Sequence, residues 1–331
     1  MNKTKLLAAG LSAVLLGTAL TGCAETEPAL TPVRLNEVVH SIFYAPQYVA
    51  LELGFFEDEG LNVELSAGQG ADKSMTALLS GGADFALLGM EAGLYVRAEG
   101  AENPAVAIAQ LTQRAGNFLV SRQEEPDFHW TDLVGKEVIG GRAGGMPQMV
   151  LEYILQQQGL NPQTDVTVTT NIAFESTAGA FTGGVGDYTV EFEPTATKLV
   201  QQGAGYIVAS LGEATGPLPY TVYMTTQSYL DKNPETVQKF VNAVYRGQEW
   251  VASHSPQEVA EAVLPQFPDS DAETLAQIIE RYQQQDTWAP DPVVNPDAYD
   301  FFQSILEAGG QLEQRIPYED MVVTDFAEQA R

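Results

Sequence analysis

Aromatic and polar side chains follow the first strand-like run of the sequence, where they could bind a small molecule. The stretch HSIFYAPQY at residues 40–48 puts aromatics, a proline and a glutamine at a strand-to-helix corner. Amphipathic aromatic groups in such a place suit the faces of a flat, partly polar ligand. A second stretch, LLGMEAG at 87–93, combines a glycine that allows close backbone approach with an acid at the start of an expected helix. These stretches supply the candidate binding residues Ser41, Phe43, Tyr44, Gln47, Gly89 and Glu91.

A glycine-rich loop precedes another expected helix and could bind an oxygen atom of a ligand. It reads IGGRAGGMPQMV at 139–150, with Pro147 at a position typical of a first helical residue. Free backbone N–H groups at a helix N-terminus favour an anionic or carbonyl oxygen. No Lys-Ser/Thr pair follows and the spacing is not G-x-G-x-x-G, so nucleotide hydrolysis is not supported. The candidates here are Gly144, Gly145 and Met146, with Arg142 or Arg114 able to assist in holding an anion.

An acidic strand near the middle of the chain adds further candidates. In GDYTVEFEP, at 186–194, Tyr188, Glu191 and Glu193 are expected to share one face of a strand, and a carboxylate at its end could accept from an amino group. Tyr220 supplies another aromatic wall. Each candidate also has a structural interpretation, because glycines punctuate turns and glutamates are common surface charges. Helical spacing assigns three other aromatics to the core: Tyr48, Phe55 and Phe56.

The sequence carries no pattern typical of catalysis or metal binding. None of the three histidines, His40, His129 and His254, has a carboxylate or thiol at a spacing that suggests a triad or a metal site. A G-x-S-x-G elbow is missing, and Cys23 is the only cysteine in 331 residues. We therefore predict a chain that is not an enzyme and that uses no cofactor and no metal.

Short strand-like runs alternate with helical ones from about 33 to 115 and again from about 117. The strand-like runs lie at 33–39, 61–66, 83–89, 104–112, 118–121, 137–141, 165–170, 187–192 and 206–211. This alternation predicts βαβ units in an α/β fold with mainly parallel sheets, on which ligands bind outside the carboxyl ends of the strands. The run LPYTVYMTT at 218–226 is suited to return the chain to the first sheet. Helices are expected near 46–59, 71–80, 91–99, 147–158, 174–182, 194–202, 233–254, 256–264, 271–285 and 296–308.

The first 22 residues have the features of a secretory signal. Lys3 and Lys5 precede a short apolar run, and small residues follow it up to Cys23. The ending LTGC resembles bacterial lipoprotein signals, which implies a signal peptide at 1–22 and acylation of Cys23. Residues 23–32 are expected to form a tether. An uncleaved anchor with an incidental cysteine is the alternative.

The chain is strongly acidic, with a formal charge of −28, or −30 without the two lysines of the signal. Its long-range field repels polyanions, so nucleic acid and bare anionic lipid are not expected as partners. The roughly 310 residues after the signal exceed what a single core usually covers, which predicts two lobes.

Several segments resemble ABC-transporter solute-binding proteins of the sulfonate, nitrate and thiamine-pyrimidine group. The resemblance is carried by FYAPQYVALELGFFEDEGLNVEL, by LLSGGADFALLG and by IGGRAGGMPQMVLEYILQQQGLNP, with the matching motifs at Gly54–Val63 and Gly82–Asp84. It implies a two-lobed type II periplasmic-binding-protein fold of the α/β class, with mixed, mainly parallel sheets and two hinge strands. Lobe one would comprise 33–115 plus 222–331, and lobe two 116–221.

This resemblance implies a monomeric, lipid-anchored protein at the outer face of the cell membrane, which closes on a solute and delivers it to the membrane subunits of an ABC permease. Aromatic and acidic candidates near the expected cleft favour a small heteroaromatic solute, thiamine-pyrimidine-like or flavin-like. The alternatives are a small anion such as a sulfonate or nitrate, and a surface enzyme acting on a pyrimidine. The Cys-rich iron motif of a related eukaryotic pyrimidine synthase is absent, which argues against that activity.

Overall fold

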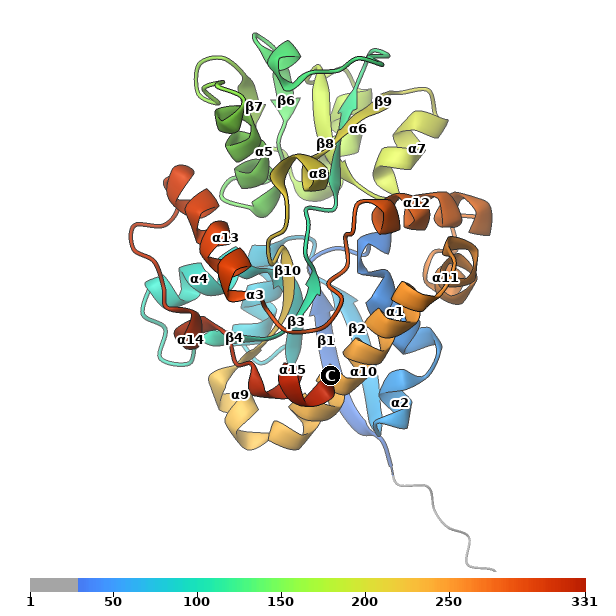
Figure 1. Ribbon diagram of the computed structural model, residues 1–331, viewed down its shortest axis with the longest axis vertical. Coiled ribbons are helices and arrows are strands. Elements are labelled where there is room, and N and C mark those ends of the chain that lie inside the picture. Colours follow the sequence, from blue (N-terminus) through green and yellow to red (C-terminus); the bar gives the residue numbers. More distant parts are fainter. Residues whose placement is uncertain (1–28) are drawn as a thin grey trace, which may run out of the picture.

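The computed structural model describes residues 29–331, and its strands form two five-stranded sheets (Figure 1). The first sheet contains β1 (Thr31–Glu37), β2 (Leu61–Ala67), β3 (Phe85–Gly89), β4 (Ala105–Thr112) and β10 (Thr221–Thr226). Their order is β2-β1-β3-β10-β4. β1 pairs in parallel with β2 and β3, whereas β10 is antiparallel to both of its neighbours, β3 and β4.

The second sheet repeats this plan. It contains β5 (Asn117–Ser121), β6 (Glu137–Ile139), β7 (Thr167–Thr169), β8 (Tyr188–Phe192) and β9 (Tyr206–Ser210), in the order β7-β6-β8-β5-β9. β6 is parallel to β7 and β8, and β5 is antiparallel to β8 and β9. The predicted α/β class with mixed, mainly parallel sheets is confirmed.

The chain passes between the two sheets twice. The first passage runs from β4 to β5 through residues 113–116, and the second runs from β9 to β10 through residues 211–220. In each sheet the strand that begins after a passage, β10 or β5, is antiparallel to both of its neighbours. Both passages lie between the upper and lower parts of the molecule in Figure 1, so the two halves are connected at one place.

Helices cover both sheets. They are α1 (Ala45–Glu52), α2 (Phe55–Asp58), α3 (Ala71–Leu79), α4 (Met90–Ala98), α5 (Met146–Gln157), α6 (Thr177–Thr182), α7 (Thr195–Gln201), α8 (Leu211–Thr215), α9 (Gln227–Lys232), α10 (Pro234–Ser253), α11 (Pro256–Val263), α12 (Ala272–Gln284), α13 (Pro296–Ala308), α14 (Tyr318–Met321) and α15 (Asp325–Ala330). Four short 3₁₀ helices are η1 (Ile42–Tyr44), η2 (Trp130–Leu133), η3 (Phe174–Ser176) and η4 (Leu264–Gln266). Among residues 29–331, none of the helices has both the length and the apolar character needed to cross a membrane.

The single helix expected near 46–59 is wrong, because the chain breaks it into α1 and α2. Gly54 adopts a φ of 74°, in the left-handed region that glycine enters without steric cost, and this ends α1 and redirects the chain. Tyr48 and Phe56 are fully buried, as expected of core residues. Phe55 is only partly buried, and the Arg246 guanidinium lies 4.3 Å from the centre of its ring.

The long helix α10 holds the core of the first half together. Pro234 stands at its start, and its buried side chains include Phe240, whose ring stacks on Phe85 of β3 with centroids 4.1 Å apart. Gly247 brings α10 close to α1, because a Cβ at that position would lie 2.2 Å from the Pro46 carbonyl oxygen. These contacts make α10 and α1 a fixed support behind the carboxyl end of β1.

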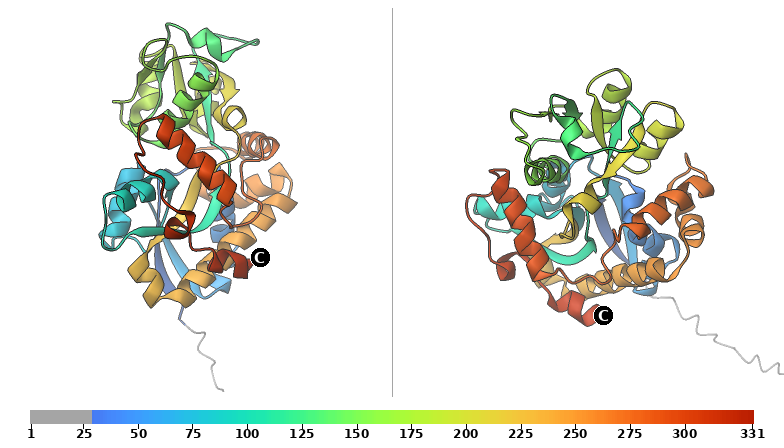
Figure 2. Two further views of the ribbon diagram at one scale, coloured as in Figure 1. Left: turned by 60° about the vertical axis from the view of Figure 1, so that its left-hand side comes forward. Right: turned by 45° about the horizontal axis from the view of Figure 1, so that its top comes forward.

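The C-terminal helices also contact the second half of the molecule. On one side, the Tyr282 hydroxyl of α12 donates to the Gly116 carbonyl oxygen at 2.7 Å, within the first passage. On the other, Phe301 of α13 packs edge-to-face on Tyr153 of α5, with ring centroids 5.6 Å apart. Figure 2 shows these helices along both flanks of the molecule. They brace the two halves against each other around the passages.

Candidate functional site

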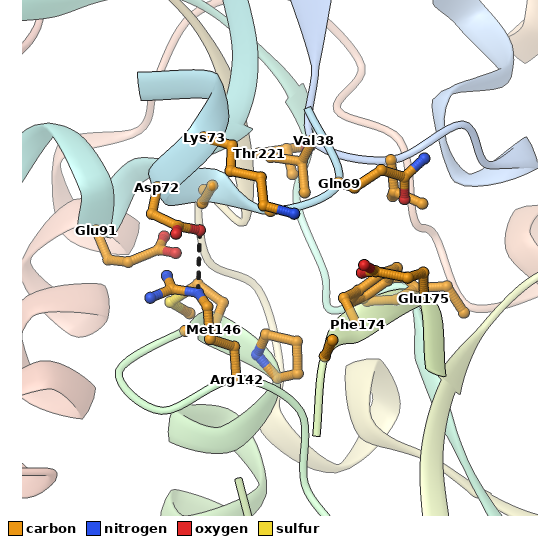
Figure 3. A pocket seen from close by; sticks show the side chains of 18 of the residues that line it. Val38, Gln69, Asp72, Lys73, Glu91, Arg142, Met146, Phe174, Glu175 and Thr221 are labelled. Atoms are coloured by element: carbon orange, nitrogen blue, oxygen red, sulfur yellow. Dashed lines mark ion pairs between the residues drawn. The ribbon is translucent and has the colours of Figure 1, made fainter. Parts of the chain in front are cut away.

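A cavity with a volume of about 250 Å³ lies where the two halves meet (Figure 3). Its walls come from both halves and from the second passage. The first half contributes Val38, Val39, Tyr44, Gln69, Gly70, Ala71, Asp72, Lys73, Gly89, Glu91 and Thr221. The second half contributes Arg142, Gly145, Met146, Pro147, Ile172, Ala173, Phe174, Glu175 and Phe192, and the passage contributes Tyr220. Most of these residues directly follow a strand or begin a helix, as expected for ligand sites on α/β sheets.

Aromatic rings form a large part of the cavity wall. Phe192, at the end of β8, lies between Phe174 and Tyr220, with ring centroids 6.0 Å and 6.3 Å away. Tyr44 follows β1 and is buried at the start of α1, with only 2 per cent of its surface exposed. Both halves therefore contribute aromatic rings to the cavity wall.

Glu91 is the buried acid of the cavity. It is the second residue of α4 and is 2 per cent exposed. Its Oε2 has no hydrogen-bond partner. Burial raises the pKa of Glu91 to about 7, although backbone N–H groups at Glu91 and Met146 and the charge of Arg142 favour the carboxylate. The acid is thus partly protonated near neutral pH.

Gly89 makes room for this acid. A Cβ at position 89 would lie 2.0 Å from Glu91 Oε2, because the carboxyl group folds back over the end of β3. Any larger residue would push the carboxyl group out of its place. Gly89 and Glu91 therefore work as one unit, a relation that was not predicted from the sequence.

An ion pair joins the two halves at the mouth of the cavity. Arg142 Nε lies 3.5 Å from Asp72 Oδ1, and these side chains are 38 and 56 per cent exposed. Figure 3 shows Arg142 reaching from the glycine-rich loop toward Asp72 and Glu91. Lys73 and Glu175 add two more charges at this exposed rim. The charged side chains of the mouth are exposed, whereas Glu91 is buried in the wall.

The glycine-rich loop does not offer the free N–H groups that the sequence suggested. The Gly144 N–H donates to Gln148 Oε1 at 2.8 Å, and the Gly145 N–H donates to the Arg142 carbonyl oxygen at 3.0 Å. The Gly144 carbonyl accepts from the Tyr95 hydroxyl at 3.0 Å, across the boundary between the halves. Gly144 is thus outside the cavity wall, whereas Gly145 and Met146 are part of it.

Three predicted residues at the first corner lie behind the cavity rather than in its wall. Ser41 caps η1, and its hydroxyl donates to the Glu193 carbonyl oxygen at 2.5 Å. Phe43 is fully buried among other aromatic rings. Gln47 donates to Glu37 Oε2 at 2.8 Å and accepts from the Tyr223 hydroxyl at 3.0 Å. Their polar groups already have partners, so they support the corner that positions Tyr44.

Four further predicted residues, Tyr188, Glu191, Glu193 and Arg114, have other partners. Tyr188 and Glu191 do not share a face, because three positions separate them, and the Tyr188 hydroxyl donates to Glu125 at 2.9 Å. Glu193 follows β8 and is paired with Arg281 of α12 and with Thr197. Arg114 lies in the first passage, where its Nη1 donates weakly to the Gly212 carbonyl oxygen at 3.4 Å. None of them lines the cavity.

Sequence reasoning missed two segments of the wall. Residues 69–73 follow β2, and residues 172–175 follow β7. Both segments come directly after strand-like runs that were identified, so the rule that placed Tyr44 and Glu91 could also have found them. Phe192 was likewise missed, although it ends the strand that supplied Glu193.

His40 forms a pairing that its sequence spacing did not indicate. Its Nδ1 lies 2.7 Å from Glu37 Oε1, and this pairing raises the pKa of His40. Its Nε2 lies 2.9 Å from the Gln266 carbonyl oxygen, so both ring nitrogens have partners within the fold. Across residues 29–331, no group of three or more His, Cys, Asp or Glu side chains is arranged to hold a metal ion. The contact of His40 with the Gln266 carbonyl oxygen holds η4 against the corner after β1.

The two sheets, their double connection and the cavity between them define a protein with the periplasmic-binding-protein fold. The alkanesulfonate-binding protein SsuA from Xanthomonas axonopodis pv. citri, solved bound to MOPS, has a similar structure, with a TM-score of 0.71. That similarity covers 90% of this chain and 99% of SsuA at 16% sequence identity, which shows a shared fold.

The chain belongs to the NMT1/THI5-like family, whose model matches residues 42–259. The putative binding protein YtlA of Bacillus subtilis (strain 168) is 44% identical over 318 residues, covering 96% of this chain and 95% of YtlA. The formylaminopyrimidine-binding protein of Halalkalibacterium halodurans is 22% identical, and the similarity covers 97% of this chain and 98% of that protein. Cys23, the predicted lipid-attachment site, lies outside the described residues.

Proposed function

We propose that this chain is the solute-binding lipoprotein of an ABC importer and that it captures a small heteroaromatic solute in the cavity between its halves. The observation that carries the proposal is the composition of that cavity. Aromatic rings from both halves line the cavity together with two buried polar atoms without partners, Glu91 Oε2 and the Tyr220 hydroxyl. A flat ring with polar edges matches such walls, because apolar faces stack on aromatics and polar edges complete the hydrogen bonds.

The size of the cavity favours a single-ring solute of the thiamine-pyrimidine type over a flavin. A volume of about 250 Å³ is below the roughly 300–1,000 Å³ of pockets for drug-sized ligands. The formylaminopyrimidine-binding protein, a relative that covers nearly the whole chain, is named for a solute of this class.

The alternative, a compact anion such as a sulfonate or nitrate, has less support. The N–H groups of Gly144 and Gly145, which would cradle an anion, are already used within the loop. An anion in the cavity would also face Glu91, whose charge disfavours it. Arg142 and Lys73 could attract an anion, but they lie at the exposed mouth.

The proposed cycle depends on closure of two lobes, 33–115 plus 222–331 and 116–221, about the two passages. Solute that contacts both lobes stabilises the closed form by its differential affinity for that form. We also propose that the protein is a monomer, anchored outside the cell membrane through lipid on Cys23, and that permease subunits receive the solute. No catalytic role is proposed: His40 and Glu37 do not line the cavity, and both ring nitrogens of His40 lie beside partners within the fold.

Native mass spectrometry of freshly purified protein tests this function directly, because a retained solute identifies itself. In parallel, thermal unfolding is followed with pyrimidines, flavins, nitrate, sulfonates and amino acids. A true solute at 100 times its dissociation constant stabilises the fold by about 2.7 kcal/mol. A co-purified anion, or stabilisation by nitrate or sulfonates alone, would refute the proposed solute class. Recovery of a chemically altered solute would refute a purely binding role.

A further inference from the structure

The wall of the cavity contains two buried polar atoms that the fold leaves without a hydrogen-bond partner. Glu91 and Tyr220 are each 2 per cent exposed, and both line the cavity. Neither Glu91 Oε2 nor the Tyr220 hydroxyl makes a hydrogen bond. In the part of the chain that the structure describes, the other buried polar atoms without partners belong to residues outside this cavity. Folded proteins rarely leave such groups unsatisfied, so a ligand is the natural partner for these two.

These groups differ from the other polar residues of the cavity. Asp72 and Arg142 are paired with each other and are 56 and 38 per cent exposed, and Lys73 and Glu175 are also exposed. Charges at an exposed mouth are screened by water and contribute little to selectivity. A buried group has little access to water that could replace a missing ligand contact, and it therefore discriminates more strongly between ligands.

The two side chains offer complementary hydrogen-bonding capacity. A carboxyl oxygen accepts a hydrogen bond in either protonation state of the acid. Tyr220 keeps its proton because burial and the nearby Glu91 raise its pKa well above 10, so its hydroxyl can donate. An acceptor and a donor in the wall of the same cavity match a ligand edge with one donor and one acceptor. An amino group beside a ring nitrogen is such an edge.

The fold also holds Glu91 in position. Its carboxyl group lies over Gly89, where no side chain competes for the space, and it begins α4, whose N-terminus stabilises a nearby negative charge. Tyr220 is fixed by its neighbours Phe43 and Phe192, whose ring centroids lie 5.7 Å and 6.3 Å from its own. Both groups are therefore preorganised, which is what a selective contact requires.

We propose that Glu91 and Tyr220 are the specificity-determining pair of the cavity: Glu91 Oε2 accepts from an amino group of the solute, and the Tyr220 hydroxyl donates to the adjacent ring nitrogen. This inference rests on the proposed function, since it takes a heterocycle as the solute. It deepens that proposal by defining the solute edge that the protein reads. A ring without the amino group leaves the acid unpartnered, and a compact anion places oxygen atoms against it.

The test measures binding of two matched probes by calorimetry. The first probe is 4-amino-2-methylpyrimidine, and the second is 2,4-dimethylpyrimidine, in which a methyl group replaces the amino group. We expect the wild-type protein to prefer the amino compound by about tenfold or more. Glu91→Met, which keeps length and removes the acceptor, and Tyr220→Phe, which removes only the hydroxyl, should each reduce that preference to about twofold or less. Nitrate and methanesulfonate should bind Glu91→Met more tightly than wild type.

Glu99→Met is the matched control. It makes the same change at the exposed C-terminal end of the same helix and should leave the preference intact. Melting curves of each variant without probe establish that it is folded. Equal preference in wild type and Glu91→Met would overturn the inference while leaving the proposed function intact. Absence of any preference in the wild type would overturn the inference as well, and failure to bind any heterocycle would in addition refute the proposed solute class.

Discussion

Glu91 should make the folded state less stable as the pH rises from acid to neutral, and Glu91→Gln should remove this effect. In the folded chain the pKa of Glu91 is about 7, against an ordinary value of 4.5, because the cavity disfavours the carboxylate. Between these two values the unfolded chain has released a proton that the folded chain still holds. Each step up in pH across that window therefore favours unfolding.

The magnitude follows from the width of the window. From 4.5 to about 7, at about 1.4 kcal/mol for each pH unit, the effect reaches about 3 kcal/mol. The contribution of Glu91 is fully present below pH 4.5 and is lost once the pH has risen past about 7. The neutral amide that Glu91→Gln introduces does not titrate and has no such window.

Urea unfolding of wild type and Glu91→Gln at several pH values between 4.5 and 8 measures the effect. The unfolding free energy of the variant minus that of wild type should rise by about 3 kcal/mol across this range. The two proteins are compared because burial also raises the pKa values of Glu37, Glu191 and Glu193. These three acids are present in both proteins, so their effect cancels in the difference. If the difference in unfolding free energy between Glu91→Gln and wild type stays constant within about 1 kcal/mol across this range, the burial of an acid at this position is refuted. Glu99→Gln serves as the exposed control.

Three further substitutions test the mouth, the bracing helices and the core. Arg142→Gln should change the unfolding free energy by less than about 1 kcal/mol, because its ion pair is exposed, but stopped-flow measurements should show faster solute release. Arg281→Met leaves the buried carboxylate of Glu193 without its charged partner and should lower the unfolding free energy by about 3 kcal/mol in urea titrations. Gly247→Ala should cost about 1–3 kcal/mol in the same assay, because the added methyl group meets the backbone of α1.

Each of these expectations has a control in the same chain. Arg315→Met breaks an exposed pair with Glu307 and should lower the unfolding free energy much less than Arg281→Met does, so an equal loss in the two variants would contradict the burial argument. Gly179→Ala adds a methyl group to α6 in open space and should be neutral or stabilising by up to about 1 kcal/mol. If Arg142→Gln releases solute at the same rate as wild type, the ion pair between Arg142 and Asp72 does not contribute to closure.

The fold was predictable because its signals are local. Alternating strand-like and helical runs identified the strands of both sheets, and Asn233–Pro234 marked the start of α10 where the structure has it. The break at Gly54 was missed, since apolar residues continue at helical spacing on both sides of it. Only the left-handed backbone of that glycine separates α1 from α2.

Residues of the candidate site were predictable from the sequence only where their place after a strand or at the start of a helix puts them in the cavity wall. Tyr44, Gly89, Glu91 and Met146 line the cavity because they follow strands or begin helices, and one sequence shows both features. Glu193 could not be distinguished from them, because its partner Arg281 lies 88 positions away and enters through α12. Partner choice for a buried polar group depends on contacts that sequence spacing does not encode.

The space that Gly89 leaves for the acid two positions later ties these two positions together in every relative that keeps this backbone. A side chain at the first position forces a shorter or reoriented residue at the second, so the pair is gained or lost as a unit. Relatives can therefore be sorted by the residues at these two positions into those that can hold a buried carboxyl group and those that bind a different solute.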